Sequence, residues 1–388
     1  MPTGPQSPKL LVVAGEASAD RHAASLIEHW RKLAPGLEVY GAGGRHLRQA
    51  GARLLFDFTQ LGVVGILEVI PNLARFYQAY RQLLDSIHRE NPNLVLLLDL
   101  PDFNLFFAGR VKAKHPNLPI LYYISPQVWA WRKGRVKKIQ RRINKMLVLF
   151  PFEKDYYRRF GVDVEFVGHP LKDQAKPSAG QTELRQRFGV ADAAPVVALL
   201  PGSRSEELRL YLPVMKQAAL ALQARHPKIA FLAAAAPTVR RETLASAFPA
   251  SLPVKIVEGA TYDALFAADL ALVASGTATL ETALLGIPMV ILGKTSWPNF
   301  LMARPFVSVP FYGLPNLLAG KEIVPELIMW NCNPARVTAE AESILGNPDR
   351  QADIRKDLAQ LRETLGPDDA SARAAAAAHA FAQARGLV

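Results

Sequence analysis

Short apolar runs alternate with longer amphipathic or polar stretches along most of the chain. Because these runs show little polar alternation, they indicate strands that are buried on both faces of a parallel sheet. The stretches between them are long enough for crossover helices. The runs lie at 9–14, 37–42, 93–99, 119–124, 145–150 and 164–167, and again at 196–200, 229–235, 254–258, 270–274 and 288–292. The pattern predicts an α/β fold with doubly wound parallel sheets.

The two series of runs are separated by a polar stretch with Pro and Gly at 172–180, and the chain of 388 residues is long enough for two domains. We therefore predict a Rossmann-like domain at 1–170, a second one at 171–347 and an alanine-rich helical tail at 348–388. Open α/β sheets bind ligands beyond the carboxyl ends of their strands. We expect such a cleft between the two domains.

The stretch 269–292 predicts a strand, a tight turn, a helix and a further strand. The turn is Ser275-Gly276-Thr277, and a helix that starts there directs unpaired N–H groups toward an anion such as phosphate. Glu281 lies one turn into this helix, where its carboxylate could accept hydrogen bonds from ribose hydroxyls. The alternative is an ordinary capped helix in which Glu281 compensates the helix dipole.

A second candidate phosphate loop follows the run at 196–200. Gly202 and Ser203 would expose backbone N–H groups, and Arg204 would add a cationic fork suited to a diphosphate. The alternative is a proline-glycine turn with a surface arginine. Two loops of this kind after strands of one domain favour a nucleotide site.

Two carboxylates follow the run at 93–99, in the segment Asp99-Leu100-Pro101-Asp102-Phe103-Asn104. One of them could remove a proton from an acceptor hydroxyl. Pro101 disfavours helical geometry at Leu100, so we expect Leu100 to be extended and the two carboxylates to point differently. We choose Asp99 as the base, and we expect Asp102 and Asn104 to contact the acceptor sugar. The alternative for Asp102 is that it caps the next helix.

The first predicted turn between strand and helix carries Glu16, Ser18, Asp20 and His22. Their polar groups could bind sugar hydroxyls or a phosphate. The alternative for His22 is a structural role, because a single histidine near a helix start is more often structural than catalytic.

The formal net charge is +12, and most of it lies in the first half: residues 1–165 hold 24 Lys and Arg against 14 Asp and Glu, a net +10. A basic run at 132–142 follows two tryptophans, and 61–84 is rich in apolar and aromatic residues. Together they favour an anionic lipid surface, ahead of a solvated face and of nucleic acid. The sequence matches no motif of a DNA- or RNA-binding protein.

Several motifs are absent from the sequence. There is no phosphate-loop lysine motif, no Gly-x-Gly-x-x-Gly after the first strand and no cluster with metal-ligand spacing, so we expect no cofactor and no metal. Cys332 is the single cysteine, which fits a reducing compartment. No apolar run is long enough to span a bilayer. The polar start at 1–8 leads us to expect no secretory signal.

In their order along the chain, these segments resemble the lipid-A-disaccharide synthases. The resemblance covers about residues 10–345, and one departure is Ala19, where the family usually has glycine. It rests on Gly15–Asp20, Asp99–Asn104, Tyr123–Arg132, Leu149–Glu153, Val167–Pro170, Leu200–Arg204, Ser275–Glu281 and Leu314–Gly320, the last of which adds Asn316 to the expected donor site.

The resemblance implies a GT-B glycosyltransferase with the UDP-sugar donor on the second domain and the tail helix returning to the first. It implies inverting, metal-independent transfer from UDP-2,3-diacylglucosamine to 2,3-diacylglucosamine 1-phosphate (lipid X). It also implies a monomer or homodimer, located peripherally on the cytoplasmic face of the inner membrane of a Gram-negative-type bacterium. The alternatives are another GT-B UDP-sugar transferase, a UDP-sugar epimerase, or a basic nucleic-acid-binding protein.

Overall fold

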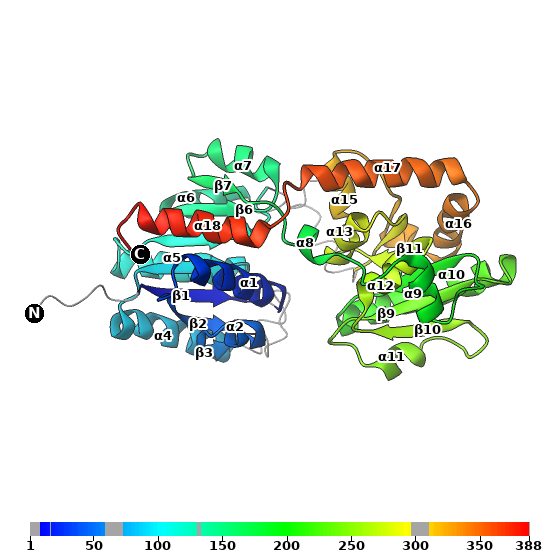
Figure 1. The fold of residues 1–388 in the computed structure, drawn as a ribbon, viewed down its shortest axis with the longest axis horizontal. Helices are drawn as coiled ribbons and strands as arrows, with labels where there is room; N and C mark the ends of the chain where they lie inside the picture. The colour runs from blue at the N-terminus through cyan, green and yellow to red at the C-terminus, as the bar shows by residue number, and fades with distance from the viewer. Residues whose placement is uncertain (1–7, 16, 59–72, 130–132, 296–309, 388) are drawn as a thin grey trace, which may run out of the picture. The chain divides into compact units, whose positions relative to one another are not determined.

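The computed structural model describes residues 8–15, 17–58, 73–129, 133–295 and 310–387. Contacts divide the chain into two compact units. The first unit comprises Met1–Pro170 and Leu365–Val388, and the second unit comprises Leu171–Thr364. Each unit is a parallel sheet with helices packed against it, as Figure 1 shows.

In its described residues the first unit has a seven-stranded parallel sheet with the order β3-β2-β1-β4-β5-β6-β7. Its central strands are apolar throughout, as the run Leu94–Leu98 illustrates, because both faces of the sheet are covered. The strands are β1 (Lys9–Ala14), β2 (Glu38–Gly43), β3 (Arg53–Asp57), β4 (Leu94–Leu98), β5 (Ile120–Tyr123), β6 (Lys145–Val148) and β7 (Val164–Phe166).

The helices of the first unit cover both faces of this sheet. On one face α4, α5 and α6 form a hydrophobic cluster with alternate strand residues, among them Val95, Leu97 and Tyr122. On the other face α18 lies alongside α1 (Figure 1). The helices are α1 (Ala17–Leu33), α2 (Arg45–Gln49), α4 (Leu73–Glu90), α5 (Pro101–Lys114), α6 (Val136–Arg142), α7 (Pro151–Arg158) and α18 (Ala370–Gln383), with the 3-10 turn η3 (Lys133–Arg135).

In the part of the second unit that is described, six parallel strands have the order β10-β9-β8-β11-β12-β13. They are β8 (Val196–Leu200), β9 (Ala230–Ala235), β10 (Val254–Glu258), β11 (Leu270–Ala274), β12 (Met289–Gly293) and β13 (Glu326–Ile328). Beside them lie α8 (Leu171–Gln174), α9 (Gln181–Arg187), α10 (Ser205–Arg225), α11 (Arg241–Ala245), α12 (Thr261–Ala267), α13 (Thr277–Leu284), α15 (Leu314–Ala319), α16 (Pro334–Leu345) and α17 (Pro348–Thr364), with the 3-10 turn η5 (Met329–Asn331).

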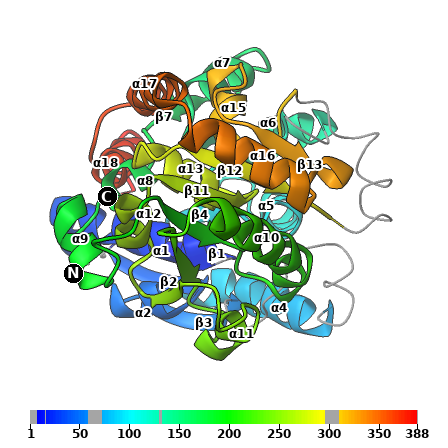
Figure 2. The ribbon, with the colours of Figure 1, turned by 90° about the vertical axis from the view of Figure 1, so that its right-hand side faces the viewer.

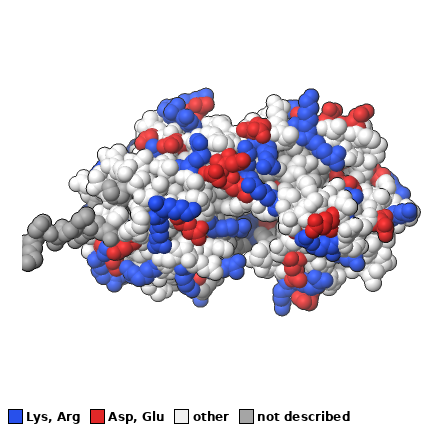
Figure 3. All heavy atoms as spheres, in the orientation of Figure 1, with Lys and Arg blue, Asp and Glu red and all other residues white. Residues whose placement is uncertain are grey.

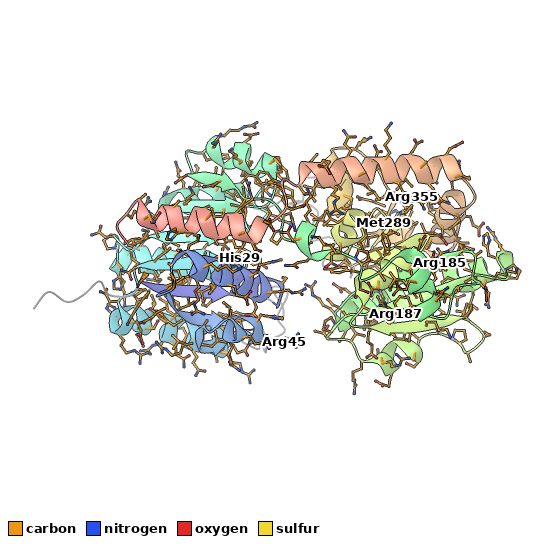
Figure 4. All side chains as sticks on the ribbon, in the orientation of Figure 1. His29, Arg45, Arg185, Arg187, Met289 and Arg355 are labelled. Carbon is orange, nitrogen blue, oxygen red and sulfur yellow. The ribbon has the colours of Figure 1, made fainter. Side chains whose placement is uncertain are left out.

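Helices α10 and α16 lie side by side in the second unit (Figure 2). Helix α9, which follows the predicted linker, is tied to the start of β11. Its Arg185, labelled in Figure 4, donates from Nε to the carbonyl of Ala267 and from Nη2 to Oδ1 of Asp269, both at 2.8 Å. The second oxygen of Asp269 accepts the Val196 N–H at 2.9 Å, so one carboxylate links α9, β11 and β8.

The predicted tail at 348–388 divides between the two units. Helix α17 belongs to the second unit, where it buries Ile354, Leu358 and Leu361, and only the chain from Leu365 onward belongs to the first. There the indole N–H of Trp30 on α1 bonds His379 on α18 at 3.3 Å. The alanine run of α18 explains its packing, because small side chains let two helices approach closely.

Charges are mixed on the visible surface of the first unit. In Figure 3, Lys and Arg side chains of this unit lie among Asp and Glu side chains rather than in one basic patch. Among the helices that the structure describes, none is both long and apolar enough to cross a membrane.

Candidate functional site

The first unit brings two predicted loops together at the carboxyl edge of its sheet. Strands β1 and β4 are neighbours, with Ala14 paired to Leu98. The two strands therefore end side by side. The segment that begins at Gly15 and the segment that begins at Asp99 both start at this edge of the sheet. This is the topological switch point of the sheet, where the strand order reverses and ligands of such folds bind.

Asp99 lies at the end of β4 in a left-handed backbone conformation, with φ of 50°, and Leu100 follows with φ of 44°. The expectation of an extended Leu100 was therefore wrong. Pro101 disfavours the right-handed region at Leu100, and the chain uses the left-handed region instead. Burial raises the pKa of the Asp99 carboxyl, and a hydrogen bond from the Leu100 N–H partly opposes this shift.

Two other predicted ligands in the first unit have structural partners. The buried carboxylate of Asp20 accepts the N–H groups of Gly44, His46 and Leu47 at 2.7, 2.9 and 3.2 Å, which caps α2. The buried amide of Asn104 donates to main-chain carbonyls at the end of β4. Because Asp20 and the amide nitrogen of Asn104 bond the protein backbone, we no longer expect them to contact a sugar. The Asn104 Oδ1 is buried and has no hydrogen-bond partner among the described atoms.

The remaining predicted residues of this edge differ in their surroundings. Asp102 is exposed and forms an ion pair with Arg135. Ser18 is exposed in the first turn of α1. Glu16 lies outside the described residues. His22 is buried, and its Nδ1 has no hydrogen-bond partner among the described atoms.

Two buried histidines lie within electrostatic reach of each other. Burial, with a smaller effect of Arg21, lowers the pKa of His22 to about 4. Burial, with a smaller effect of His22, lowers the pKa of His169 to about 3. Both imidazoles are therefore neutral at pH 7 and can act as hydrogen-bond partners but not as cations. His169 lies in Val167–Pro170, one of the segments that carry the resemblance, but its sequence context predicted no role for it.

Glu153 is a buried carboxylate in this unit that was not among the predicted site residues. Glu153 accepts the indole N–H of Trp129 at 3.0 Å and the N–H groups of Leu149 and Phe150 at 3.2 Å. Burial raises the pKa of Glu153 to about 7. Its position in the first turn of α7 resembles an ordinary helix cap, so nothing local in the sequence signals that it ties the segment after β5 to the segment after β6.

The second unit also has its switch point between two predicted loops. Strands β8 and β11 are neighbours, with Leu200 paired to Val273. The loop with Gly202, Ser203 and Arg204 and the loop with Ser275, Gly276 and Thr277 therefore leave adjacent strands at the same edge. Helices α10 and α13 begin directly after these loops, so two helix N-termini lie at this edge.

The first of these loops has an internal carboxylate. Glu207 accepts the N–H of Ser203 at 2.8 Å and that of Arg204 at 3.2 Å, and the Arg204 guanidinium pairs with it at 3.1 Å. Gly202 has φ of 107°, and a Cβ there would collide with the Glu207 carboxylate. The loop thus holds its N–H donors and its arginine around one carboxylate.

The second loop is open to solvent at Gly276 and Thr277, and no side chain caps the start of α13 in the described structure. Glu281, one turn further on, accepts the hydroxyl hydrogen of Tyr262 at 2.9 Å. Tyr262 was not among the predicted residues. It orients one oxygen of the carboxylate that we expect to bind a ribose.

The predicted donor-site residue Asn316 makes its hydrogen bonds within the protein. Its buried side chain accepts the N–H groups of Ile323 and Val324 at 2.8 and 3.0 Å, and it donates to the Val324 carbonyl at 2.7 Å and to Glu326 at 2.8 Å. These four bonds use the amide inside the protein. Asn316 holds the chain between α15 and β13, and we therefore expect no direct contact with a nucleotide.

In the described ranges, no group of three His, Cys, Asp or Glu side chains is placed to hold a metal ion. Each unit thus has one switch point that could bind a ligand. The switch point of the first unit carries the partly buried Asp99, and that of the second unit carries two helix N-termini and Arg204.

Comparisons with known proteins agree with this arrangement. A family model described as lipid-A-disaccharide synthetase matches residues 10–381. The lipid-A-disaccharide synthase of Syntrophus aciditrophicus is 45% identical over 370 residues, which cover 94% of this chain and 96% of that protein.

Two solved structures show the same fold. The structure of S. aureus MnaA with UDP has a TM-score of 0.65 at 13% identity and covers 98% of both chains. The calicheamicin glycosyltransferase CalG4 has a TM-score of 0.61 at 14% identity, with 98% of this chain and 100% of that chain covered. The architecture is therefore GT-B. On the strength of the family match and the close sequence relative, the chain belongs to the lipid-A-disaccharide synthetase family, a family of glycosyltransferases of lipid A synthesis.

Proposed function

We propose that the chain transfers 2,3-diacylglucosamine from its UDP derivative to the 6-hydroxyl of 2,3-diacylglucosamine 1-phosphate. The products are a β-1,6-linked disaccharide 1-phosphate and UDP, and the anomeric carbon inverts. Family membership supports the reaction class. The observation that carries the finer proposal is the pair of phosphate-type loops at the β8–β11 switch point, combined with the partly buried carboxylate of Asp99 at the β1–β4 switch point.

In the proposed mechanism Asp99 removes the proton from the acceptor 6-hydroxyl as its oxygen attacks the anomeric carbon. The new oxygen–carbon bond forms on the face opposite to the bond that breaks, which leads to inversion. The electron pair of the breaking bond leaves with UDP. The N–H groups of Ser275, Gly276 and Thr277 and the guanidinium of Arg204 stabilise this charge without a metal.

The outcome of the reaction can be tested on the product. Nuclear magnetic resonance of the disaccharide should show a β linkage at the newly formed bond, starting from an α-linked donor. An α-linked product would contradict the single displacement, because retention of configuration requires two successive displacements. This measurement is independent of any variant.

Arg204→Ala should weaken UDP binding about 10- to 100-fold, because a charge-assisted hydrogen bond contributes roughly 1.5–3 kcal/mol. Isothermal titration calorimetry with UDP measures this effect. The matched control is Arg209→Ala on α10, the helix that follows Arg204, since Arg209 pairs with Glu206 on the exposed surface. Equal UDP affinity of wild type and the Arg204 variant would remove Arg204 from the donor site.

We also propose that the protein works at the cytoplasmic face of the inner membrane as a peripheral protein. Residues 61–72 and 130–132 of the predicted membrane face lie outside the described residues. In the described part, three apolar side chains on α4 and α5 are exposed: Leu73 by 62%, Tyr77 by 59% and Phe106 by 50%. Arg110 lies 5.4 Å from the centre of the Phe106 ring. Exposed bases on the neighbouring α6 are Lys137, Lys138 and Arg141.

This surface predicts two separable contributions to vesicle binding. Headgroup attraction gives on the order of 1 kcal/mol per basic residue and is screened by salt, whereas insertion of apolar side chains is not. The double change Tyr77→Ser and Phe106→Ser should therefore remove the salt-resistant part of binding to anionic vesicles. Changing the three α6 bases to Gln should remove mainly the salt-sensitive part.

The control for this experiment is Leu33→Ser, which changes an apolar residue of similar exposure, 49%, on α1. Vesicle co-sedimentation at low and high salt separates the two parts, and circular dichroism confirms the fold of each variant. Complete release of wild type by salt alone would contradict insertion of the α4–α5 surface.

A further inference from the structure

The end of β4 has a backbone conformation that requires support. Asp99 and Leu100 are two consecutive residues other than glycine with positive φ, 50° and 44°. This conformation is strained for residues other than glycine and persists only when the surroundings hold it there. An observed conformation of this kind, directly at the proposed base, indicates that neighbouring groups fix the direction of the Asp99 side chain.

Two buried side chains bind the main chain at this point. The amide nitrogen of Asn104, on the first turn of α5, donates to the carbonyl of Leu98 at 3.0 Å and to that of Asp99 at 2.7 Å. The hydroxyl of Tyr122, on the neighbouring strand β5, donates to the same Asp99 carbonyl at 2.5 Å. Asn104 and Tyr122 are both fully buried. The Asp99 carbonyl thus has two donors from two different elements.

Leu100, the second residue of this turn, is also held in the left-handed conformation by a close contact. Leu100 packs against Gly15 at the end of β1, where a Cβ would lie 2.6 Å from the Leu100 Cβ. The position of Leu100 therefore depends on a glycine in the neighbouring loop. Contacts from β1, β5 and α5 all hold the same two residues.

We propose that Tyr122 and Asn104 are positioning residues, which hold Asp99 in its left-handed conformation and thereby direct its carboxylate toward the acceptor hydroxyl. This proposal rests on the proposed role of Asp99 as the base. It assigns to Tyr122 a function that its position inside a buried strand does not suggest. It also replaces the sugar contact expected of Asn104 with a contact to the backbone of the base.

The left-handed turn also affects the ionisation of the base. The N–H of Leu100 bonds the Asp99 carboxyl and lowers its pKa, against the upward effect of burial. If the turn relaxes, this bond is lost and the pKa of Asp99 rises further. The other ionisable groups near Tyr122 and Asn104 are Tyr157 and Arg135, both of which influence the pKa of Tyr122, and Asp102, which pairs with Arg135. None of these three is changed in the proposed test.

Tyr122→Phe removes one hydroxyl and keeps the ring in the core. We expect kcat to fall about 10- to 100-fold, because a small misplacement of a catalytic group has an effect of this size. We expect KM for both substrates to stay within about threefold, since no substrate contact is lost. The acidic limb of the pH profile of kcat should move to higher pH, because the carboxylate loses the Leu100 hydrogen bond.

The matched control is Tyr123→Phe, which removes a buried hydroxyl from the next residue of the same strand. Because successive strand residues face opposite sides of the sheet, this hydroxyl does not lie on the Asp99 side. The control should keep the kcat and the pH profile of wild type. A loss of thermal stability shared by both variants, without a change in the pH profile, would indicate a purely structural role and overturn the proposal.

Asn104→Ser provides a second variant if Tyr122→Phe does not fold, and it should show the same fall in kcat and the same shift of the acidic limb. The two proposals fail in different ways. Full activity of Asp99→Asn would overturn the role of Asp99 itself. An inactive Asp99→Asn together with a wild-type kcat and pH profile in Tyr122→Phe would overturn only the positioning role of Tyr122 and Asn104.

Discussion

Asp99→Asn is expected to lower kcat by about 10²- to 10⁴-fold, the usual cost of losing a general base, while UDP affinity stays unchanged. The Asn side chain has almost the same shape as Asp and cannot accept the proton of the acceptor hydroxyl. Steady-state turnover and calorimetry with UDP measure the two quantities. Asp85→Asn, an exposed change on α4, is the control and should behave as wild type.

The pH profile gives an independent test of the same residue. The base acts as a carboxylate, and burial raises the pKa of Asp99 above its ordinary value. The kcat of the wild type should therefore fall as pH decreases through this raised pKa and reach a plateau above it. The residual activity of Asp99→Asn should lack this limb. A wild-type turnover of the purified variant would exclude Asp99 and direct attention to Asp102 or Glu16.

Asn316→Ala is expected to lower the free energy of unfolding by about 2–4 kcal/mol. The change leaves the N–H groups of Ile323 and Val324 without their acceptor in a buried position, and each buried group without a partner costs about 1–3 kcal/mol. Urea unfolding followed by fluorescence measures the effect. UDP affinity, measured at a temperature where the variant is folded, should remain close to that of wild type.

The control for Asn316 is Asn333→Ala. Asn333 caps the exposed start of α16 by accepting the Arg336 N–H, so its loss should cost about 1 kcal/mol. A variant at position 316 that is as stable as this control but has lost UDP affinity would restore Asn316 to the donor site.

Most strands could be predicted from the sequence because they are continuous apolar runs. The runs at 9–14, 196–200, 254–258 and 270–274 coincide with β1, β8, β10 and β11. No strand range was predicted for β3, where Arg53 and Asp57 flank three apolar residues. Strand β13 was not predicted either, since Glu326–Ile328 is only three residues long and carries no periodic signal. The alanine-rich composition predicted helices in the tail, but it could not show that α17 and α18 belong to different units.

The positions of the two switch points could also be predicted, since candidate residues that directly follow apolar runs must lie at the carboxyl edge of a parallel sheet. The roles of single polar residues could not. Asp20 and Asn316 occur in loops with the composition of a ligand site, yet their partners are main-chain groups of other segments. Tyr122 and Glu153 lie in segments that resemble ordinary core and an ordinary helix cap. Their partners, Asp99 and Trp129, are 23 and 24 residues away in sequence.

The most direct test of the proposed reaction uses the purified protein with UDP-2,3-diacylglucosamine, lipid X and an excess of chelator. The account predicts release of UDP that requires lipid X and equals the disaccharide 1-phosphate formed, at the same rate with and without the chelator. Release of UDP without lipid X, or loss of turnover in the chelator that added metal restores, would contradict it.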